Sequence, residues 1–129
     1  MKHENRNLRI ELMNVLYQYD LYTQSNISFI PNFEIEEASP IFHQIIENLS
    51  TIDQIIENAL FDYSLSRLAF VDRAIIRLAV YELNYTDLAK QIIIDEAVEI
   101  TKIYSNLDDQ KQHKFTNRVL DNIAKNIKG

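Results

Sequence analysis

Apolar residues recur every three or four positions along most of the chain, which is the spacing of an amphipathic helix rather than the alternation of a strand. The first such segment predicts a helix over about residues 6–23. One side of it carries Leu8, Leu12, Val15, Tyr19 and Tyr22. A second apolar row, roughly opposite on a helical wheel, carries Ile10, Tyr17 and Leu21. This helix is therefore either sandwiched by other helices or covered by a partner.

Loop and capping signals divide the next part of the chain. Residues 25–33 contain a proline and two asparagines, so we expect a loop there. Ser39 followed by Pro40 is typical of a helix start, with serine as N-cap and proline at the first helical position. Ser50 with Asp53 resembles a second capping signal within the same apolar stripe. This stripe forms either two helices or one bent helix.

Residues 71–85 are apolar on almost every side, as expected of a central, buried helix. Arg73, Arg77 and Asn84 fall on one narrow strip of its surface. Glu82 lies on the apolar side, where a carboxylate without a partner costs several kcal/mol. Glu82 is therefore expected either to bind a partner protein or to be bonded internally, for example to an arginine.

Two further helices are predicted over about residues 93–104 and 112–127, with a polar loop over residues 106–111. The last helix has Phe115, Val119, Ile123 and Ile127 at a strict spacing of four. No strand-like alternation is sustained anywhere. The pattern predicts one all-α domain over residues 1–129, with six or seven helices.

The composition narrows the class of protein further. One glycine and two prolines among 129 residues disfavour hairpin-rich β folds, whose tight turns need residues with positive φ. The absence of cysteine excludes disulfides, thiolate zinc sites and cysteine nucleophiles. No signal pattern or membrane span is evident, so a cytoplasmic location is expected. The net charge of −6 means that any nucleic-acid contact must be a local cationic patch.

Candidate catalytic and metal sites are weak. Nucleotide-phosphate loops need glycines, and the only glycine here is Gly129. His43 and Glu47 lie four positions apart without a third ligand, which is typical of an exposed polar pair rather than a metal site. The acidic start of the helix at residues 93–104 fits the helix dipole. No Gly-x-Ser-x-Gly turn exists. We therefore expect no enzyme activity, no metal, no cofactor and no small-molecule substrate.

The N-terminus carries a modest basic cluster of Lys2, His3, Arg6 and Arg9. Arg6 and Arg9 are three positions apart and share a helix face if the first helix begins early. Such a pair is usually a solvated face, although it also suits an RNA phosphate backbone.

Four segments of the chain, in this order and spacing, resemble the NusB family: RIELMNVLYQYDL from Arg9, VDRAIIRLAVYEL from Val71, IDEAVEITKIY from Ile94 and HKFTNRVLD from His113. The resemblance implies two small helical bundles packed together. It also implies a transcription antitermination factor without catalysis. With the ribosomal protein NusE, such a protein binds the single-stranded boxA element of nascent ribosomal RNA in the transcription elongation complex.

The resemblance assigns roles to particular residues. The family's arginine-rich RNA-binding motif aligns with Arg6 and Arg9, next to Lys2, and Lys114 is available to phosphate. The surface for the ribosomal protein includes Tyr17 and Glu82, and Phe115 resembles a further part of it. We therefore expect that replacing Arg6 and Arg9 by alanine weakens RNA binding and leaves the fold intact.

Three departures from the family pattern affect these expectations. Asn5 and Asn7 stand where basic or small residues are frequent, so intrinsic RNA affinity is expected to be weaker. Arg118 replaces a glycine and either alters packing or adds surface charge. The loop at residues 106–111 is about three residues longer. Two alternatives stay open: an adaptor that has lost RNA binding, and an RNA cytosine methyltransferase, for which the chain has no catalytic domain.

Overall fold

A computed structural model describes residues 2–61, 63–105 and 111–127, with side chains from residue 5 onward. All of its regular elements are helical, which confirms the predicted all-α class. They are α1 (Lys2–Gln24), α2 (Ala38–Glu47), α3 (Leu49–Ala59), the short 3₁₀ helix η1 (Leu65–Arg67), α4 (Phe70–Tyr85), α5 (Lys90–Tyr104) and α6 (Lys111–Asn126).

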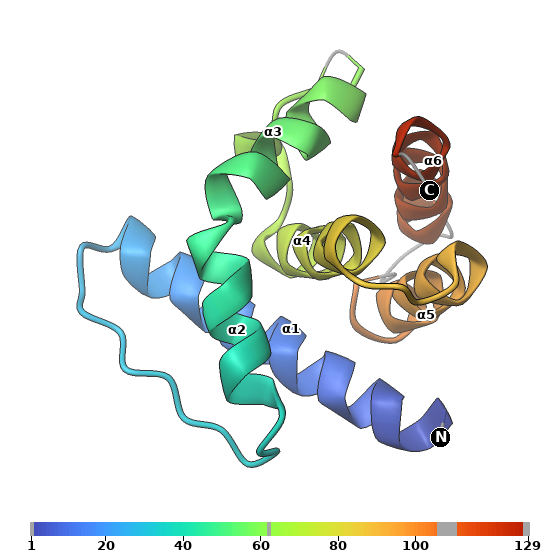
Figure 1. Cartoon of the computed structure of the whole chain (residues 1–129). Coiled ribbons are helices and arrows are strands. Elements are labelled where there is room, and N and C mark those ends of the chain that lie inside the picture. The colour runs from blue at the N-terminus through green and yellow to red at the C-terminus, as the bar shows by residue number, and fades with distance from the viewer. Residues whose placement is uncertain (1, 62, 106–110, 128–129) are drawn as a thin grey trace.

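Helix α4 lies at the centre of the molecule, between α1–α3 on one side and α5 and α6 on the other (Figure 1). It contacts every other α-helix, and α1 passes beneath it so that its N-terminal end lies next to α5. Eleven of the sixteen residues of α4 are buried, as the nearly continuous apolar sequence predicted. The core therefore runs through both groups of helices without a break.

Helix α1 begins earlier than predicted and ends one residue beyond the predicted end. Its C-terminus is closed by two backbone bonds, from the N–H of Ile27 to the carbonyl of Tyr22 at 2.9 Å and from Asn26 to Thr23 at 3.1 Å. Asn26 has a φ of 58°, the left-handed conformation that this kind of cap needs. Asparagine tolerates that conformation better than most residues, so the turn forms without glycine.

The predicted start of α2 is wrong by about two residues. The helix begins at Ala38, and Glu37 rather than Ser39 is its N-cap, with no side-chain capping bond. Pro40 is then the third helical residue. It is still in the first turn, where a backbone N–H has no partner within the helix. Pro40 therefore predicted the correct turn of the chain for the start of α2, but not the correct first residue.

The apolar stripe that follows forms two helices, α2 and α3, which meet at Asn48. The predicted capping by Ser50 and Asp53 is wrong, because α3 begins at Leu49 with Asn48 as its N-cap. Asp53 instead accepts two hydrogen bonds from Arg77 of α4, both at 2.9 Å. The carboxylate that the sequence pattern assigned to a helix cap therefore forms a long-range ion pair.

In the polar strip of α4, Arg73 and Arg77 face α1 and α3 rather than solvent, whereas Asn84 is exposed. Arg73 donates to Asp20 of α1 at 2.7 Å, and both residues are buried. Arg77 also approaches Asp20, at 3.5 Å, besides binding Asp53. These two arginines connect three helices through charge-assisted bonds.

A loop of thirteen residues, 25–37, joins α1 to α2. Its backbone N–H groups at Glu34 and Ile35 donate to the carboxylate of Glu11 at 2.9 and 3.1 Å. Phe29 and Phe33 each pack against Phe42 of α2. The predicted loop thus has defined packing on the first half of the core.

The described residues contain neither a membrane-spanning helix nor a metal-binding group of side chains. None of the helices in the described ranges is long and apolar enough to cross a membrane. Among the same residues, no group of three or more His, Asp or Glu side chains could hold a metal ion. His43 bonds the carbonyl of Ser39 at 2.8 Å through Nδ1.

Candidate functional site

The two arginines of the predicted RNA motif are both engaged in ion pairs within the protein. Arg6 binds Glu96 of α5 with two hydrogen bonds, from Nε at 2.7 Å and from one terminal nitrogen at 2.8 Å. The Arg6 side chain is 31% exposed, so one edge of its guanidinium still faces solvent. The bonds to Glu96 raise the pKa of Arg6 above its ordinary value, and the group stays charged.

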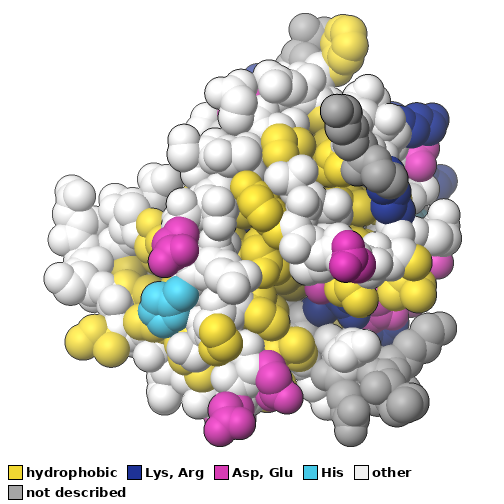
Figure 2. Space-filling model, in the orientation of Figure 1, with side chains coloured by type: hydrophobic (Ala, Val, Ile, Leu, Met, Phe, Trp, Pro, Cys, Tyr) yellow, Lys and Arg dark blue, Asp and Glu magenta, His cyan; other side chains and the backbone are white. Residues whose placement is uncertain are grey.

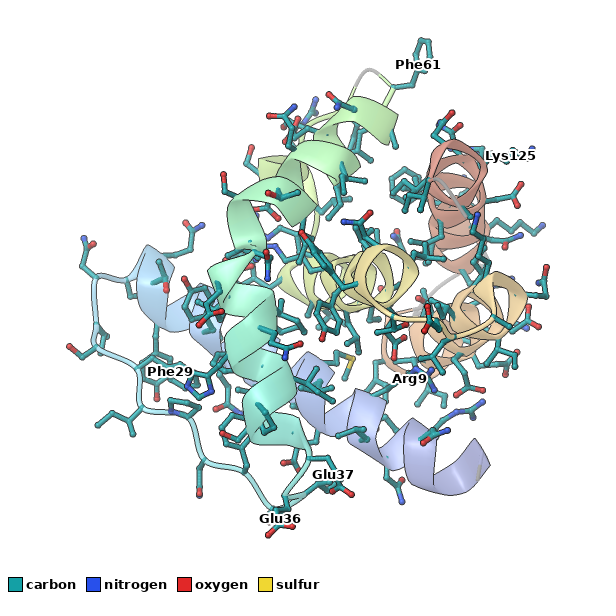
Figure 3. The ribbon with its side chains drawn as sticks, in the orientation of Figure 1. Arg9, Phe29, Glu36, Glu37, Phe61 and Lys125 are labelled. Carbon is teal, nitrogen blue, oxygen red and sulfur yellow. The ribbon has the colours of Figure 1, made fainter. Side chains whose placement is uncertain are left out.

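Arg9 is 5% exposed, and its Nε donates to Glu82 of α4 at 3.0 Å. The prediction that Arg9 contacts RNA phosphates does not agree with this placement, because a phosphate would have to displace a buried carboxylate. Figure 3 shows Arg9 above α1, on the side of α4 and α5. Arg9 belongs to the contact between these helices.

The same bond gives Glu82 the internal ion pair that the sequence analysis offered as one of its two roles. Its side chain is 12% exposed and has an internal partner in Arg9. Burial raises the pKa of Glu82, while the nearby charge and hydrogen bond of Arg9 lower it and Glu96 raises it further. The expectation that the fold survives the loss of both arginines has no support from this contact, since removing Arg9 would leave Glu82 buried without its partner.

The side chain of Lys2, the third predicted N-terminal RNA contact, lies outside the described residues, as does that of His3. The polar loop predicted at 106–111 lies outside them as well, apart from Lys111. Among the described arginines of the N-terminal motif, only Arg6 therefore offers positive charge at the surface.

A cationic hollow lies where the first turns of α6 meet the segment before α4. Its volume is about 480 Å³, and its walls include Tyr63, Lys111, Lys114, Phe115 and Arg118. The rings of Tyr63 and Phe115 meet edge to face with centroids 5.9 Å apart. The Arg118 guanidinium lies over Phe115, 5.8 Å from the ring centroid. Exposed cations beside aromatic rings are the combination that single-stranded nucleic acid binds, through phosphates and bases respectively.

The wall of this hollow also contains one carboxylate. Asp72, in the first turn of α4, is 5% exposed and accepts a hydrogen bond from the hydroxyl of Ser105 at the end of α5. Burial raises the pKa of Asp72, and the bond from Ser105 partly offsets this. The bond also ties α4 to α5 behind the hollow, so the floor is held by two helices.

Of the three predicted partner-binding residues, Phe115 lines this hollow, whereas Tyr17 and Glu82 lie elsewhere. Tyr17 is half-buried and packs edge to face on Phe70, at the start of α4, with centroids 6.3 Å apart. Glu82 lies at the other end of α4 and lines a separate, mostly apolar hollow of about 210 Å³ between α1, α2 and the α4–α5 turn. Exposed Leu88 forms part of that wall. Figure 2 shows apolar side chains gathered along the middle of this face.

Sequence reasoning named Lys114, Phe115 and the unusual Arg118, and the structure brings all three to one hollow. It missed Tyr63 and Lys111. The signal for Lys111 was available, because Lys111, Lys114 and Arg118 repeat at helical spacing. Tyr63 lies in the irregular stretch between α3 and η1, where no periodicity predicts its direction.

The fold and the hollow define an all-helical protein with a local cationic, aromatic surface on an acidic molecule. The model of the NusB family matches residues 6–125, and the chain belongs to this family. It is 40% identical to the transcription antitermination protein NusB of a Nitratiruptor species, a match that covers 93% of this chain and 91% of that protein.

Solved structures agree with this assignment. A structure described as T. maritima NusB superposes with a TM-score of 0.77 at 35% identity, covering 95% of this chain and 91% of that one. A structure of the antitermination factors NusB and NusE in complex with double-stranded RNA superposes with a TM-score of 0.75 at 29% identity, covering 97% and 98%.

Proposed function

We propose that this protein is a transcription antitermination factor that binds boxA-type single-stranded RNA of nascent ribosomal RNA together with the ribosomal protein NusE. It acts in the cytoplasm as a single RNA-binding domain, within the transcription elongation complex and without catalysis. The observation that carries the RNA assignment is the cationic hollow at α6, because it combines three cations with two aromatic rings on a protein of net charge −6.

Each part of the hollow has a role in this proposal. Lys114 and Arg118 bind phosphates, and the exposed edges of Tyr63 and Phe115 stack on bases. Arg6 contributes a phosphate contact through its exposed edge, and Lys2 belongs to the same N-terminal arm. Arg9 has no RNA contact and instead holds α1 against α4.

The NusE surface includes Tyr17 and Glu82. The hollow beside Glu82 supports this, since its mostly apolar wall, which holds the paired Arg9 and Glu82, suits an apolar side chain with a polar end from a protein partner. Phe115 contacts RNA or the edge of NusE, depending on how the two ligands share the first turns of α6. Base identity is read jointly, because the chain supplies few polar groups that could distinguish bases.

The test is a titration of a fluorescently labelled boxA-type RNA with this protein, with and without NusE. We expect weak binding alone and stronger binding with NusE. Lys114→Ala should weaken binding and reduce the slope of log affinity against log salt by about 0.7, the value for one phosphate contact on a single strand. Lys102→Ala, on the exposed face of α5, is the matched control and should leave both quantities unchanged.

The adaptor alternative is favoured by the internal pairing of both N-terminal arginines. It predicts NusE binding without any RNA contribution from this chain. If the RNA affinity of NusE is the same with and without this protein, and the protein alone shows no binding, the RNA proposal is wrong and the adaptor is correct.

A further inference from the structure

The basic residues of α6 continue well beyond the cationic hollow. Lys111, Lys114, Arg118 and Lys125 lie within a narrow arc of the helix, because they are spaced by three, four and seven residues. We call these four residues the α6 strip. From its first to its last residue the strip extends about 21 Å along the helix axis. Figure 2 shows Lys and Arg side chains gathered over α6 at one edge of the molecule.

A second hollow, of about 320 Å³, lies along the far half of the α6 strip. It is bordered by Phe61, Phe115, Arg118 and Lys125, together with residues at the end of α3. Arg118 lines both hollows, so the two are neighbours separated by one guanidinium and the Phe115 ring beneath it. Phe115 and Arg118 therefore form a wall between two adjoining depressions on one surface.

Phe61 is an exposed aromatic ring at this second hollow. It is 92% exposed, and so it lacks the stabilisation that burial would give a phenylalanine. Figure 3 shows Phe61 and Lys125 projecting at the same end of the molecule, from the segment after α3 and from α6. An aromatic face next to a row of cations suits a nucleobase and its phosphates better than it suits solvent.

We infer that single-stranded RNA flanking the boxA-type element runs along the α6 strip from the first hollow to the second, with a base on Phe61 and phosphates on Arg118 and Lys125. This inference rests on the proposed function and extends its footprint. At the ~3.4 Å rise of a stacked strand, the strip accommodates about six nucleotides in all. We favour RNA over a peptide as the occupant of this surface. The Phe61 ring stands open, and among the described residues of this surface no deep apolar pocket could receive a peptide side chain.

Among the described residues of the second hollow, Asp121 is an acidic group that opposes this path and supplies a sensitive test. Asp121 lines the second hollow and pairs with Lys125 at 3.4 Å, with both side chains mostly exposed. Exposed pairs at this spacing are weak, so a phosphate can compete for Lys125. The remaining carboxylate repels the same phosphate, and Asp121→Asn should therefore strengthen binding of a longer RNA.

The experiment compares three RNAs by fluorescence anisotropy on the whole chain, alone and with NusE: a boxA-type core, and the same core with about six unstructured nucleotides added at the 5′ or the 3′ end. The affinity of the chain for NusE is measured alongside. We expect one of the two extensions to bind about five- to tenfold more tightly than the core. Phe61→Ala and Lys125→Ala should each remove most of that gain and leave core affinity within about twofold. Asp121→Asn should increase the gain about two- to threefold.

Ile30→Ala and Lys102→Ala are matched controls, because both side chains are exposed and lie on other elements. All the substitutions are at exposed positions, so folding should be unaffected, which circular dichroism checks. If the core binds but neither extension gains affinity, or if Phe61→Ala leaves the gain unchanged, the inference is wrong and the proposed function stands. Failure of every RNA to bind, with NusE present, contradicts the proposed function itself. Loss of NusE affinity in Phe61→Ala with unchanged RNA binding would overturn the inference and assign this surface to a protein.

Discussion

Arg9 and Glu82, 73 positions apart in the chain, form an ion pair that is almost entirely removed from solvent. Two charges in such surroundings depend on each other, because the cost of burying each charge is met only by its partner and hydrogen bonds. The raised pKa of Glu82 shows that the compensation is incomplete. The pair itself therefore contributes little net stability, but losing one member would leave the other as an unpaired buried charge and would be costly.

Replacing one member of this pair should destabilise the protein strongly. Arg9→Ala is expected to lower the free energy of unfolding by about 3–5 kcal/mol, since it leaves a buried carboxylate unpaired. The double variant Arg9→Met, Glu82→Leu should recover much of the loss. Urea unfolding followed by circular dichroism measures both. A loss below about 1 kcal/mol in the single variant would show that solvent reaches Glu82 freely.

The carboxylate of Asp72 should give the stability a recognisable pH dependence. Its pKa is raised in the folded state by burial, so folding binds an extra proton between the unfolded and folded pKa values. Ionising Asp72 thus costs stability as pH rises from about 4 through the raised pKa. Asp72→Asn does not have this cost. The stability of the variant relative to the wild type should increase across that range and then level off, as urea unfolding at a series of pH values would show. A constant difference would contradict the raised pKa.

At the scale of elements, α4 is held to its neighbours by charges as well as by apolar packing. Asp20 of α1 accepts from Arg73 and lies near Arg77. Its side chain is 8% exposed, whereas that of Asp53 of α3 is 26% exposed. The ion pair between α4 and α1 is therefore less accessible to solvent than the ion pair between α4 and α3.

This difference in exposure predicts unequal effects of matched substitutions. Asp20→Asn should cost about 3 kcal/mol or more of stability, because both arginines lose a buried counter-charge. Asp53→Asn should cost about 1 kcal/mol, since solvent screens that pair and Arg77 keeps Asp20 nearby. Thermal and urea unfolding of the two variants would check the order. Equal losses would mean that burial does not set the strength of these pairs.

The elements themselves were largely predictable from sequence, and the partners of their charged residues were not. The nearly all-apolar segment at residues 71–85 predicted a central helix, because such a surface must be covered on all sides. That pattern cannot say which distant carboxylate meets Arg73. In the same way, the spacing of Ser50 and Asp53 suggested a cap, and the resemblance to the NusB family suggested RNA for Arg9. The spacing of Lys114, Phe115 and Arg118 was visible, whereas Tyr63 reaches their hollow from an irregular segment. The local spacing of apolar residues predicts which face of a helix is buried. The residues that this face contacts depend on how the helices pack together.

At the scale of the whole molecule, an overall negative charge coexists with one cationic edge. Distant acidic groups repel RNA, and among the described residues the phosphates are attracted mainly by the cations of the α6 strip, with one further contact from Arg6, so binding should be modest.

The salt dependence of RNA binding should report this small number of contacts. With the four cations of the α6 strip and Arg6, and about 0.7 per phosphate on a single strand, the slope of log affinity against log salt should be about −3.5 for an extended RNA, and less steep for the core. Anisotropy titrations between low and moderate salt concentrations measure it. A slope much steeper than this would require further cations, from the N-terminal arm or from a different face.

Because α4 contributes to both groups of helices, neither group can separate from the other without exposing the helix that has the most buried residues among the described elements. Amide hydrogens in the middle of α4 should therefore exchange with solvent only when the entire molecule opens, and at the same opening free energy whether they face α1 or α5. The protein should behave as one cooperative unit, and a ligand that binds on α6 would slow exchange in α1 as well.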